Sequence, residues 1–230
     1  MSLPAAVRRR AGRPGVLVAA VAAACVALVA GCGAPQYTYV TNSDENTYLK
    51  VPADWHQIDE DVLGEAVGLD PQVPAKEGGL WLQAYDAADQ PSPSHLFGRH
   101  AADPAVFVGV RQVPPSTRGQ VSLDGLRDFF FPVSPAGRQR AAADPTSAFA
   151  DFALLADEVL TPGDGLRGVH SVYRYRLGGG PTQVINQTMY TNDDASRVYM
   201  LFVRCSVTCY EQHKGEIEGV VSSFTVREAR

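Results

Sequence analysis

Three clusters of turn-forming residues divide the second half of this chain into four strand-like runs. The clusters are Thr161–Gly165, Gly178–Pro181 and Asn192–Ser196, and each is rich in Gly, Pro, Asn, Asp or Ser. Such residues favour the tight turns that join neighbouring antiparallel strands. The sequence therefore predicts an antiparallel meander, and this prediction restricts the fold more than any other feature of the chain.

The runs also indicate where each strand lies in the sheet. In the second run, apolar residues and Ser171 alternate with His170, Arg174 and Arg176. This alternation is typical of a strand with one face in the core and the other in solvent. We expect the two arginines to be solvated, with anion binding as the alternative. Because Val198–Val203 is apolar on both faces, we expect it at the centre of the sheet.

A helix and a last strand complete the second half. Thr208 followed by Glu211 has the spacing of a capping box, which predicts a helix from Cys209 to about Val221. Ser222–Val226 then has the composition of a final strand. The second half therefore predicts a sheet with a helix near its end.

The first half of the domain is less regular. Strands are expected at Asn46–Val51, Gly79–Tyr85 and Ala105–Val113, each bounded by Pro, Gly or polar residues. A helix is expected after Ser122, because Leu and Phe residues recur at helical spacing as far as Phe130. These elements add strands and a helix to the same domain.

Large aromatic side chains give two further expectations. Trp55 follows the first strand, and we expect it in the core rather than as a platform for a ligand. Of the consecutive residues Phe129, Phe130 and Phe131, we expect two to fill the core and the third to be exposed as a partner contact.

The first 31 residues have the order of a secretory signal peptide. Arg8–Arg10 and Arg13 are followed by Val16–Ala30, an apolar run of 15 residues, and residues 1–31 contain no acidic side chain. A membrane-spanning helix needs about 20 apolar residues, so the run is short for a permanent anchor. We therefore expect residues 1–31 to be removed from the mature protein.

The end of this leader is followed by a cysteine. Val29, Ala30, Gly31 and Cys32 resemble the lipobox of bacterial lipoproteins. The resemblance implies cleavage after Gly31 and a lipid on Cys32, which would hold the chain at the extracytoplasmic face of a cell membrane. Several acyl chains give stable attachment, whereas a single chain is marginal. An ordinary secretory signal with an incidental cysteine is the alternative.

Composition then divides the mature chain. Residues 32–45 are polar and contain Pro35, so we expect a short lipidated tether. Residues 46–230 are long enough for one globular domain with its own core. Within this domain, residues 60–105 are rich in Asp, Pro, Gly and Ser, and we expect a polar insertion there.

Two cysteines remain after Cys32. Cys205 and Cys209 flank the predicted strand end and helix start, a geometry that brings Cα atoms within about 6 Å, close enough for a disulfide. Export places them in an oxidising compartment, where a disulfide persists. We expect this disulfide. Free thiols and a metal site are the alternatives.

The charge of the mature chain argues against a nucleic-acid partner. Without the four leader arginines among its 20 Lys and Arg, it holds 16 against 25 Asp and Glu, a formal charge of −9. Binding to phosphate backbones depends on concentrated positive charge. The same charge repels anionic headgroups, so we expect membrane attachment through the lipid.

Motifs for catalysis are absent from the sequence. It contains no G-x-S-x-G elbow, phosphate loop, H-E-x-x-H motif or calcium loop, and we predict no catalytic residue, cofactor or metal site. His95, His100 and Asp103 are close in sequence and are expected to be solvated, with a divalent metal as the alternative. His170 and Ser171 are neighbours on a strand, so they point to opposite faces and form no catalytic dyad.

Two stretches together are similar to a known family. Tyr48–Val51 leads into Pro52–Trp55, and near the end of the chain a strand is followed by Cys205–Tyr210, a helix, and Ser223 with Phe224. This arrangement resembles the PsbP-like fold, which small actinobacterial lipoproteins of the LpqN type share. The resemblance implies an α+β fold with an antiparallel sheet flanked by helices, and a role that is usually non-catalytic.

We therefore predict a membrane-anchored extracytoplasmic lipoprotein that serves as a non-enzymatic binding or accessory module of the cell envelope. Its partner is expected to be a protein or an envelope ligand. The alternative function is an envelope hydrolase whose site is formed by the 60–105 insertion.

Overall fold

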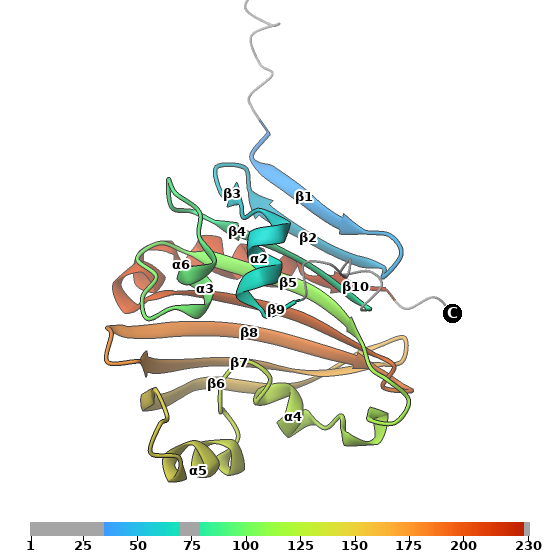
Figure 1. The fold of residues 1–230 in the computed structure, drawn as a ribbon. Helices are drawn as coiled ribbons and strands as arrows, with labels where there is room; N and C mark the ends of the chain where they lie inside the picture. The colour runs from blue at the N-terminus through green and yellow to red at the C-terminus, as the bar shows by residue number, and fades with distance from the viewer. Residues whose placement is uncertain (1–34, 70–78, 228–230) are drawn as a thin grey trace, which may run out of the picture. The chain divides into compact units, whose positions relative to one another are not determined.

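In a computed structural model that describes residues 35–69 and 79–227, seven strands form one antiparallel sheet (Figure 1). Their order across the sheet is β3-β4-β5-β9-β8-β7-β6. The strands are β3 (His56–Gln57), β4 (Leu80–Asp86), β5 (Ala105–Gln112), β6 (Phe149–Gly163), β7 (Leu166–Leu177), β8 (Thr182–Asn192) and β9 (Arg197–Ser206). The predicted α+β class, an antiparallel sheet flanked by helices, is confirmed.

The predicted meander is also confirmed. Strands β6, β7, β8 and β9 pair in chain order, and their connections fall in the three predicted turn clusters. In the first turn, Asp164 and Gly165 have φ values of 48° and 75°, the left-handed conformation that tight hairpin turns require. Strand β9 lies between β5 and β8, at the predicted centre of the sheet.

A small sheet and the longest of the described helices cover one face of the large sheet. The small sheet has the order β1-β2-β10, with β1 (Tyr37–Asn42), β2 (Thr47–Pro52) and β10 (Thr225–Val226), and the helix is α6 (Val207–Ser223). Their inward side chains form one hydrophobic core with β5 and β9. Trp55 belongs to this core and is 4 % exposed, as predicted.

Helix α6 begins two residues earlier than predicted. Its N-cap is Ser206, whose side chain accepts a hydrogen bond from the backbone N of Cys209 at 3.2 Å. The predicted cap, Thr208, lies inside the first turn. Ser206 takes the role because it ends β9 and already has the extended backbone that an N-cap needs.

Short helices supply a second core on the opposite face. Helices α2 (Glu60–Ala66), α3 (Pro93–Phe97) and α4 (Leu123–Arg127) contribute Leu63, Leu96 and Leu126 to it. Ser122 caps α4 as predicted, accepting a hydrogen bond from Gly125 N at 3.0 Å. The turn η1 (Arg118–Gln120) precedes α4, and α5 (Pro135–Ala143) precedes β6.

The three consecutive phenylalanines divide as predicted. Phe131 is buried, and the ring of Phe130 packs 4.7 Å from that of Phe202. Phe129 is 36 % exposed. One ring of the three is therefore accessible at the surface.

Two predicted boundaries need correction, and two predicted features lie outside the described residues. The signal peptide, residues 1–31, and the lipidation site Cys32 are outside. The tether prediction, 32–45, is wrong for Tyr37–Asn42, which forms β1 and pairs with β2 along its whole length. Alternating aromatic and β-branched residues favour a strand there. The predicted insertion, 60–105, supplies α2, β4 and α3, so its described residues are part of the fold.

Within the described residues, the side chains of both hydrophobic cores come from Val40 and later positions. Residues Gln36–Arg230 form one compact unit.

Strand β6 is an edge of the large sheet, because among the described residues it pairs with β7 alone. Its register shifts between residues 150 and 153, 154 and 156, and 160 and 163, and Asp151 has a φ of 55°. Leu154, Leu155 and Val159 on this strand are 46–55 % exposed. Helix α6 packs over β9, β8 and β2, so the outer strands keep one face open.

Candidate functional site

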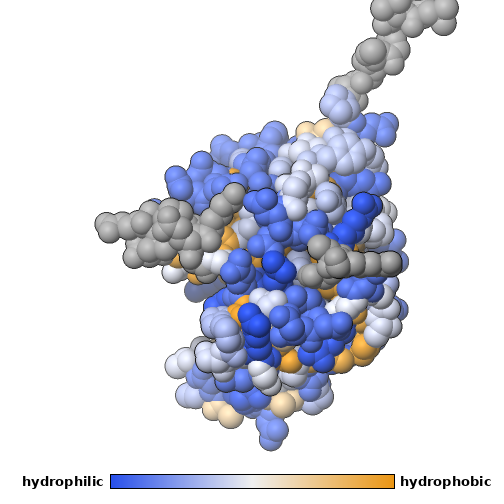
Figure 2. Space-filling model, turned by 90° about the vertical axis from the view of Figure 1, so that its right-hand side faces the viewer, coloured by the Kyte–Doolittle hydropathy of each residue, from blue (hydrophilic) through white to orange (hydrophobic). Residues whose placement is uncertain are grey.

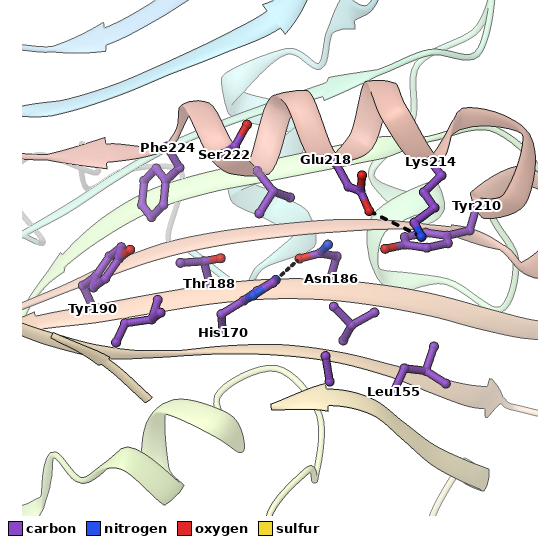
Figure 3. Close-up of a pocket in the computed structure, with 14 residues that line it drawn as sticks. Leu155, His170, Asn186, Thr188, Tyr190, Tyr210, Lys214, Glu218, Ser222 and Phe224 are labelled. Carbon is purple, nitrogen blue, oxygen red and sulfur yellow. Dashed lines mark hydrogen bonds and ion pairs between the residues drawn. The ribbon is translucent and has the colours of Figure 1, made fainter. Parts of the chain in front are cut away.

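A groove lies between helix α6 and the outer strands β6, β7 and β8 (Figure 3). Its volume is about 620 Å³, within the roughly 300–1,000 Å³ typical of small-molecule sites. The strands contribute Leu155, Ala156, Leu160, His170, Val172, Asn186, Thr188 and Tyr190, and the helical side contributes Tyr210, Lys214, Glu218, Val221, Ser222 and Phe224. The lining is mainly apolar.

The repeat of side chains along the strands and along α6 determines which residues line the groove. On β7, His170 and Val172 face the groove, whereas the residues between and beside them face the opposite core. On α6, Tyr210, Lys214 and Glu218 recur every four residues and form one stripe toward the strands. A helix over the middle of the sheet and an uncovered edge therefore leave a channel between them.

A polar pair lies in the floor of the groove. Nε2 of His170 is 2.9 Å from Oδ1 of Asn186, on the neighbouring strand (Figure 3). Thr188 is the residue directly opposite His170 in the β7–β8 register. An imidazole, an amide and a hydroxyl offer both donors and acceptors within an apolar lining. The floor can therefore orient one polar group of a bound molecule.

The helical wall carries charges, whereas one end of the groove is aromatic. Lys214 Nζ lies 3.6 Å from Glu218 Oε1, and both side chains are more than half exposed. Such an exposed pair contributes little to stability. Tyr190 and Phe224 stand with ring centroids 5.9 Å apart. Burial raises the pKa of the Tyr190 phenol, so its hydroxyl stays neutral.

The structure separates His170 from Ser171, as predicted. Ser171 faces away from the groove and donates a hydrogen bond to Oδ1 of Asp157 at 2.6 Å. Arg127 donates to the same carboxylate through Nε and Nη2, both at 2.9 Å. Burial alone would raise the pKa of Asp157, but these hydrogen bonds outweigh it and lower the pKa. This cluster ties α4 to β6 and β7.

The two predicted surface arginines have different environments. Arg176 Nε lies 2.6 Å from Oδ2 of Asp151, so a carboxylate already engages it. Arg174 follows Val172 on the same face of β7. Its Nε is buried and has no hydrogen-bond partner within the described residues. The structure therefore does not join the two arginines in one anion site.

The histidines of the 60–105 segment have local partners. His95 Nδ1 lies 2.6 Å from Oδ2 of the fully buried Asp86, which also accepts hydrogen bonds from the backbone N of Ala88 and Ser92. These contacts hold the loop that leads into α3. His100 Nδ1 is 3.3 Å from Gln183 Nε2.

Metal-ligating side chains do not converge in the described residues. No three His, Cys, Asp or Glu side chains within residues 35–69 and 79–227 are grouped so that they could hold a metal ion. In particular, His95, His100 and Asp103, the predicted residues of the metal alternative, form no such group.

Cys205 and Cys209 form a disulfide across the end of β9 and the first turn of α6. Their Cα atoms are 5.9 Å apart, and both residues are buried. The link fixes the start of α6 against the sheet. It therefore positions the end of the helical wall that carries Tyr210.

Sequence patterns did not indicate this groove. Its walls come from strands and a helix far apart in the chain, and Lys214 and Glu218 have the pattern of a solvent-facing helix stripe. The sequence offered one indication of the groove, the polar residues Asn186 and Thr188 among the apolar residues of their strand. Polar side chains at these positions indicate that this face of the strand does not lie against a hydrophobic core.

Comparisons with known proteins give similarity of backbone arrangement only. No family model and no curated protein matches the chain. Among solved structures, cyanobacterial PsbP (CyanoP) from Synechocystis sp. PCC 6803 has 14 % identity and a TM-score of 0.49, over 86 % of this chain and 96 % of that chain.

Two further solved structures are similar at this level. LpqN of Mycobacterium tuberculosis, described as involved in cell envelope biogenesis, has 14 % identity and a TM-score of 0.43, over 84 % of this chain and 91 % of that chain. The Ran-binding protein Mog1p of Saccharomyces cerevisiae has 10 % identity and a TM-score of 0.42, over 84 % and 96 %. None of the helices in the part of the chain that the structure describes has the length and hydropathy to cross a membrane.

Proposed function

We propose that this chain is a lipid-anchored, extracytoplasmic binding module that holds an amphiphilic ligand of the cell envelope in the groove between α6 and β6–β8. The observation that carries this proposal is an apolar groove of about 620 Å³ with the His170–Asn186 pair in its floor. The role is one of binding and does not require a reaction.

The lining supports an amphiphile over a fully polar ligand. Leu155, Leu160 and Val172 offer apolar surface, and each Å² of apolar area removed from water contributes about 25 cal/mol to binding. A hydrocarbon part along these residues leaves a polar part to meet the His170–Asn186 pair. A ligand without a hydrocarbon part would leave the apolar walls exposed to water.

Titration with a dansyl-labelled fatty acid tests the groove. Leu155 lines the groove and is 46 % exposed, so Leu155→Asp places a charge in it without opening a core. We expect at least about tenfold weaker binding, because a carboxylate opposes transfer of hydrocarbon into the site.

The neighbouring Leu154 gives a matched control, because it is 50 % exposed and does not line the groove. Leu154→Asp should bind the probe as the unchanged chain does. Equal loss of binding in both variants would contradict the groove as the site.

Metabolic labelling tests the anchor separately. The lipobox residues Val29–Cys32 predict that Cys32→Ala abolishes incorporation of an alkyne-tagged fatty acid. The unchanged chain should be labelled and recovered with membranes. Equal labelling of both proteins would show that Cys32 is not the lipidated residue.

A further inference from the structure

The small sheet has an outward face that is rich in tyrosine and basic residues. Because side chains alternate along a strand, the buried residues Val40 and Leu49 place their neighbours on this outer face. We call it the aromatic-basic face. It comprises Tyr37, Tyr39, Tyr48, Lys50 and Arg227.

Cations and rings are interleaved across this face. Lys50 Nζ lies 4.7 Å from the ring centroid of Tyr37, and Arg227 Cζ lies 5.4 Å from that of Tyr48. Tyr39 is 74 % exposed. Large aromatic rings that are exposed beside basic groups are typical of a membrane interface, where the ring sits at headgroup level.

The face lies where the predicted anchor joins the domain. Tyr37, the first residue of β1, is five positions after Cys32. A fully extended segment of that length spans at most about 18 Å. A lipid on Cys32 therefore keeps the beginning of β1 within that distance of the bilayer.

Charge distinguishes this face from the rest of the chain. The outward residues of β1, β2 and β10 include Lys50 and no carboxylate, and Arg227 directly follows β10. The acidic residues nearest in sequence are Glu45 and Asp54, in the turns that flank β2, and Glu228, which follows Arg227 and lies outside the described residues. Glu45 is engaged by Arg197, whose Nε lies 2.7 Å from its Oε2. Residues 32–230 carry a formal charge of −9. Hydrophilic residues of either charge or none cover much of the surface drawn in Figure 2. The net charge therefore makes an anionic bilayer repel the chain as a whole, whereas the cations of this face are attracted to it.

We propose that the aromatic-basic face contacts the surface of an anionic phospholipid bilayer, with its tyrosine rings among the headgroups and Lys50 and Arg227 at the phosphates. The inference rests on the lipid-anchoring part of the proposed function and not on the groove ligand. It assigns the anchored domain an orientation, with the small sheet toward the membrane.

Footprinting on vesicles tests the contact. The chain 32–230 is coupled through the Cys32 thiol to a maleimide lipid, since Cys205 and Cys209 are joined in a disulfide. One set of vesicles contains phosphatidylglycerol with phosphatidylcholine, and the other phosphatidylcholine alone. Hydroxyl-radical oxidation of each exposed side chain is then measured by mass spectrometry.

We expect oxidation of Tyr39 to slow at least about threefold on the phosphatidylglycerol vesicles, because each basic residue near an anionic surface strengthens contact about fivefold. Leu154 and Leu155 on β6 should oxidise equally on both. Lys50→Glu should remove the protection of Tyr39. The matched control Lys214→Glu, at a lysine of α6, should keep it.

Protection of the β6 leucines in place of Tyr39, or equal oxidation of Tyr39 on both vesicles, would overturn the proposed contact. Coupling through the thiol replaces the natural lipid. The result is therefore independent of whether Cys32 is acylated in cells, which the Cys32→Ala labelling decides.

Discussion

The two halves of the large sheet differ in how they are covered. Strands β5 and β9 lie between the two hydrophobic cores, and most of their residues are buried. Strands β6 and β7 have α4 on one side and the groove on the other, and β6 is exposed along most of its length. The comparison indicates that the closed half is packed against a hydrophobic core on both faces, whereas the open half leaves one face uncovered along the groove.

The largest effect is expected in the closed half. Trp55→Ala should lower the free energy of unfolding by about 3–5 kcal/mol, because it leaves a large cavity in a packed core. Thermal and urea unfolding of the chain 33–230 measure this loss. Leu154→Ala on the open half serves as the control and should change little. An unchanged unfolding midpoint for Trp55→Ala would contradict the proposed difference between the two halves.

The second-largest effect is expected for the disulfide, because it joins β9 of the closed half to α6, the helix that forms one wall of the groove. Replacing both cysteines, Cys205→Ser with Cys209→Ser, should cost on the order of 2 kcal/mol, since the closed loop is short. Probe binding should also weaken, because the start of α6 is no longer fixed. Mass mapping of the native protein without reductant should find the linked peptide, and two alkylatable thiols would argue against the link.

A smaller, pH-dependent effect is expected in the open half. The pKa of Asp157 is lowered in the folded chain, so its stabilisation is present above the unfolded pKa of about 4 and is lost as pH falls through the folded pKa. Asp157→Asn should cost about 1 kcal/mol at neutral pH and less in acid. Urea midpoints measured across acid pH test this. A constant difference would show that the carboxylate charge contributes nothing.

The smallest effect is expected at the rim of the groove. Lys214 is 60 % exposed in its pair with Glu218, so Lys214→Ala should change the free energy of unfolding by less than about 0.5 kcal/mol. Calorimetry checks this value. A loss as large as that for Asp157→Asn would mean that the open half depends on its surface charges for stability.

Sequence patterns anticipated the closed half and the meander well. Apolar runs such as Val198–Val203 and turn clusters such as Gly178–Pro181 are local signals, because a strand buried on both faces and a tight turn each restrict the residues that form them. The buried position of Trp55 followed from similar reasoning. The order of the strands across the sheet also followed in part from the short turns.

The groove and the start of the domain were harder to predict. The groove depends on where α6 lies across β8, which is a tertiary arrangement that no residue of α6 signals alone. The sequence of β1 gives a weak strand signal, because the stretch around it is polar with Pro35 and few large aliphatic residues, and only Val40 in the strand is buried. The cap at Ser206 was missed because both Ser206 and Thr208 have the right chemistry, and the end of β9 decides between them.

The broken register of β6 affects how two copies of the chain can associate. An unpaired strand edge can pair with the edge of a sheet in another molecule, which leads to aggregation. The shifts near residues 150, 154 and 160 interrupt the even spacing of amide and carbonyl groups that a second chain would need to pair along the whole edge. The kinked edge therefore disfavours pairing between two copies along β6, while Leu155 on the same strand remains exposed in the groove.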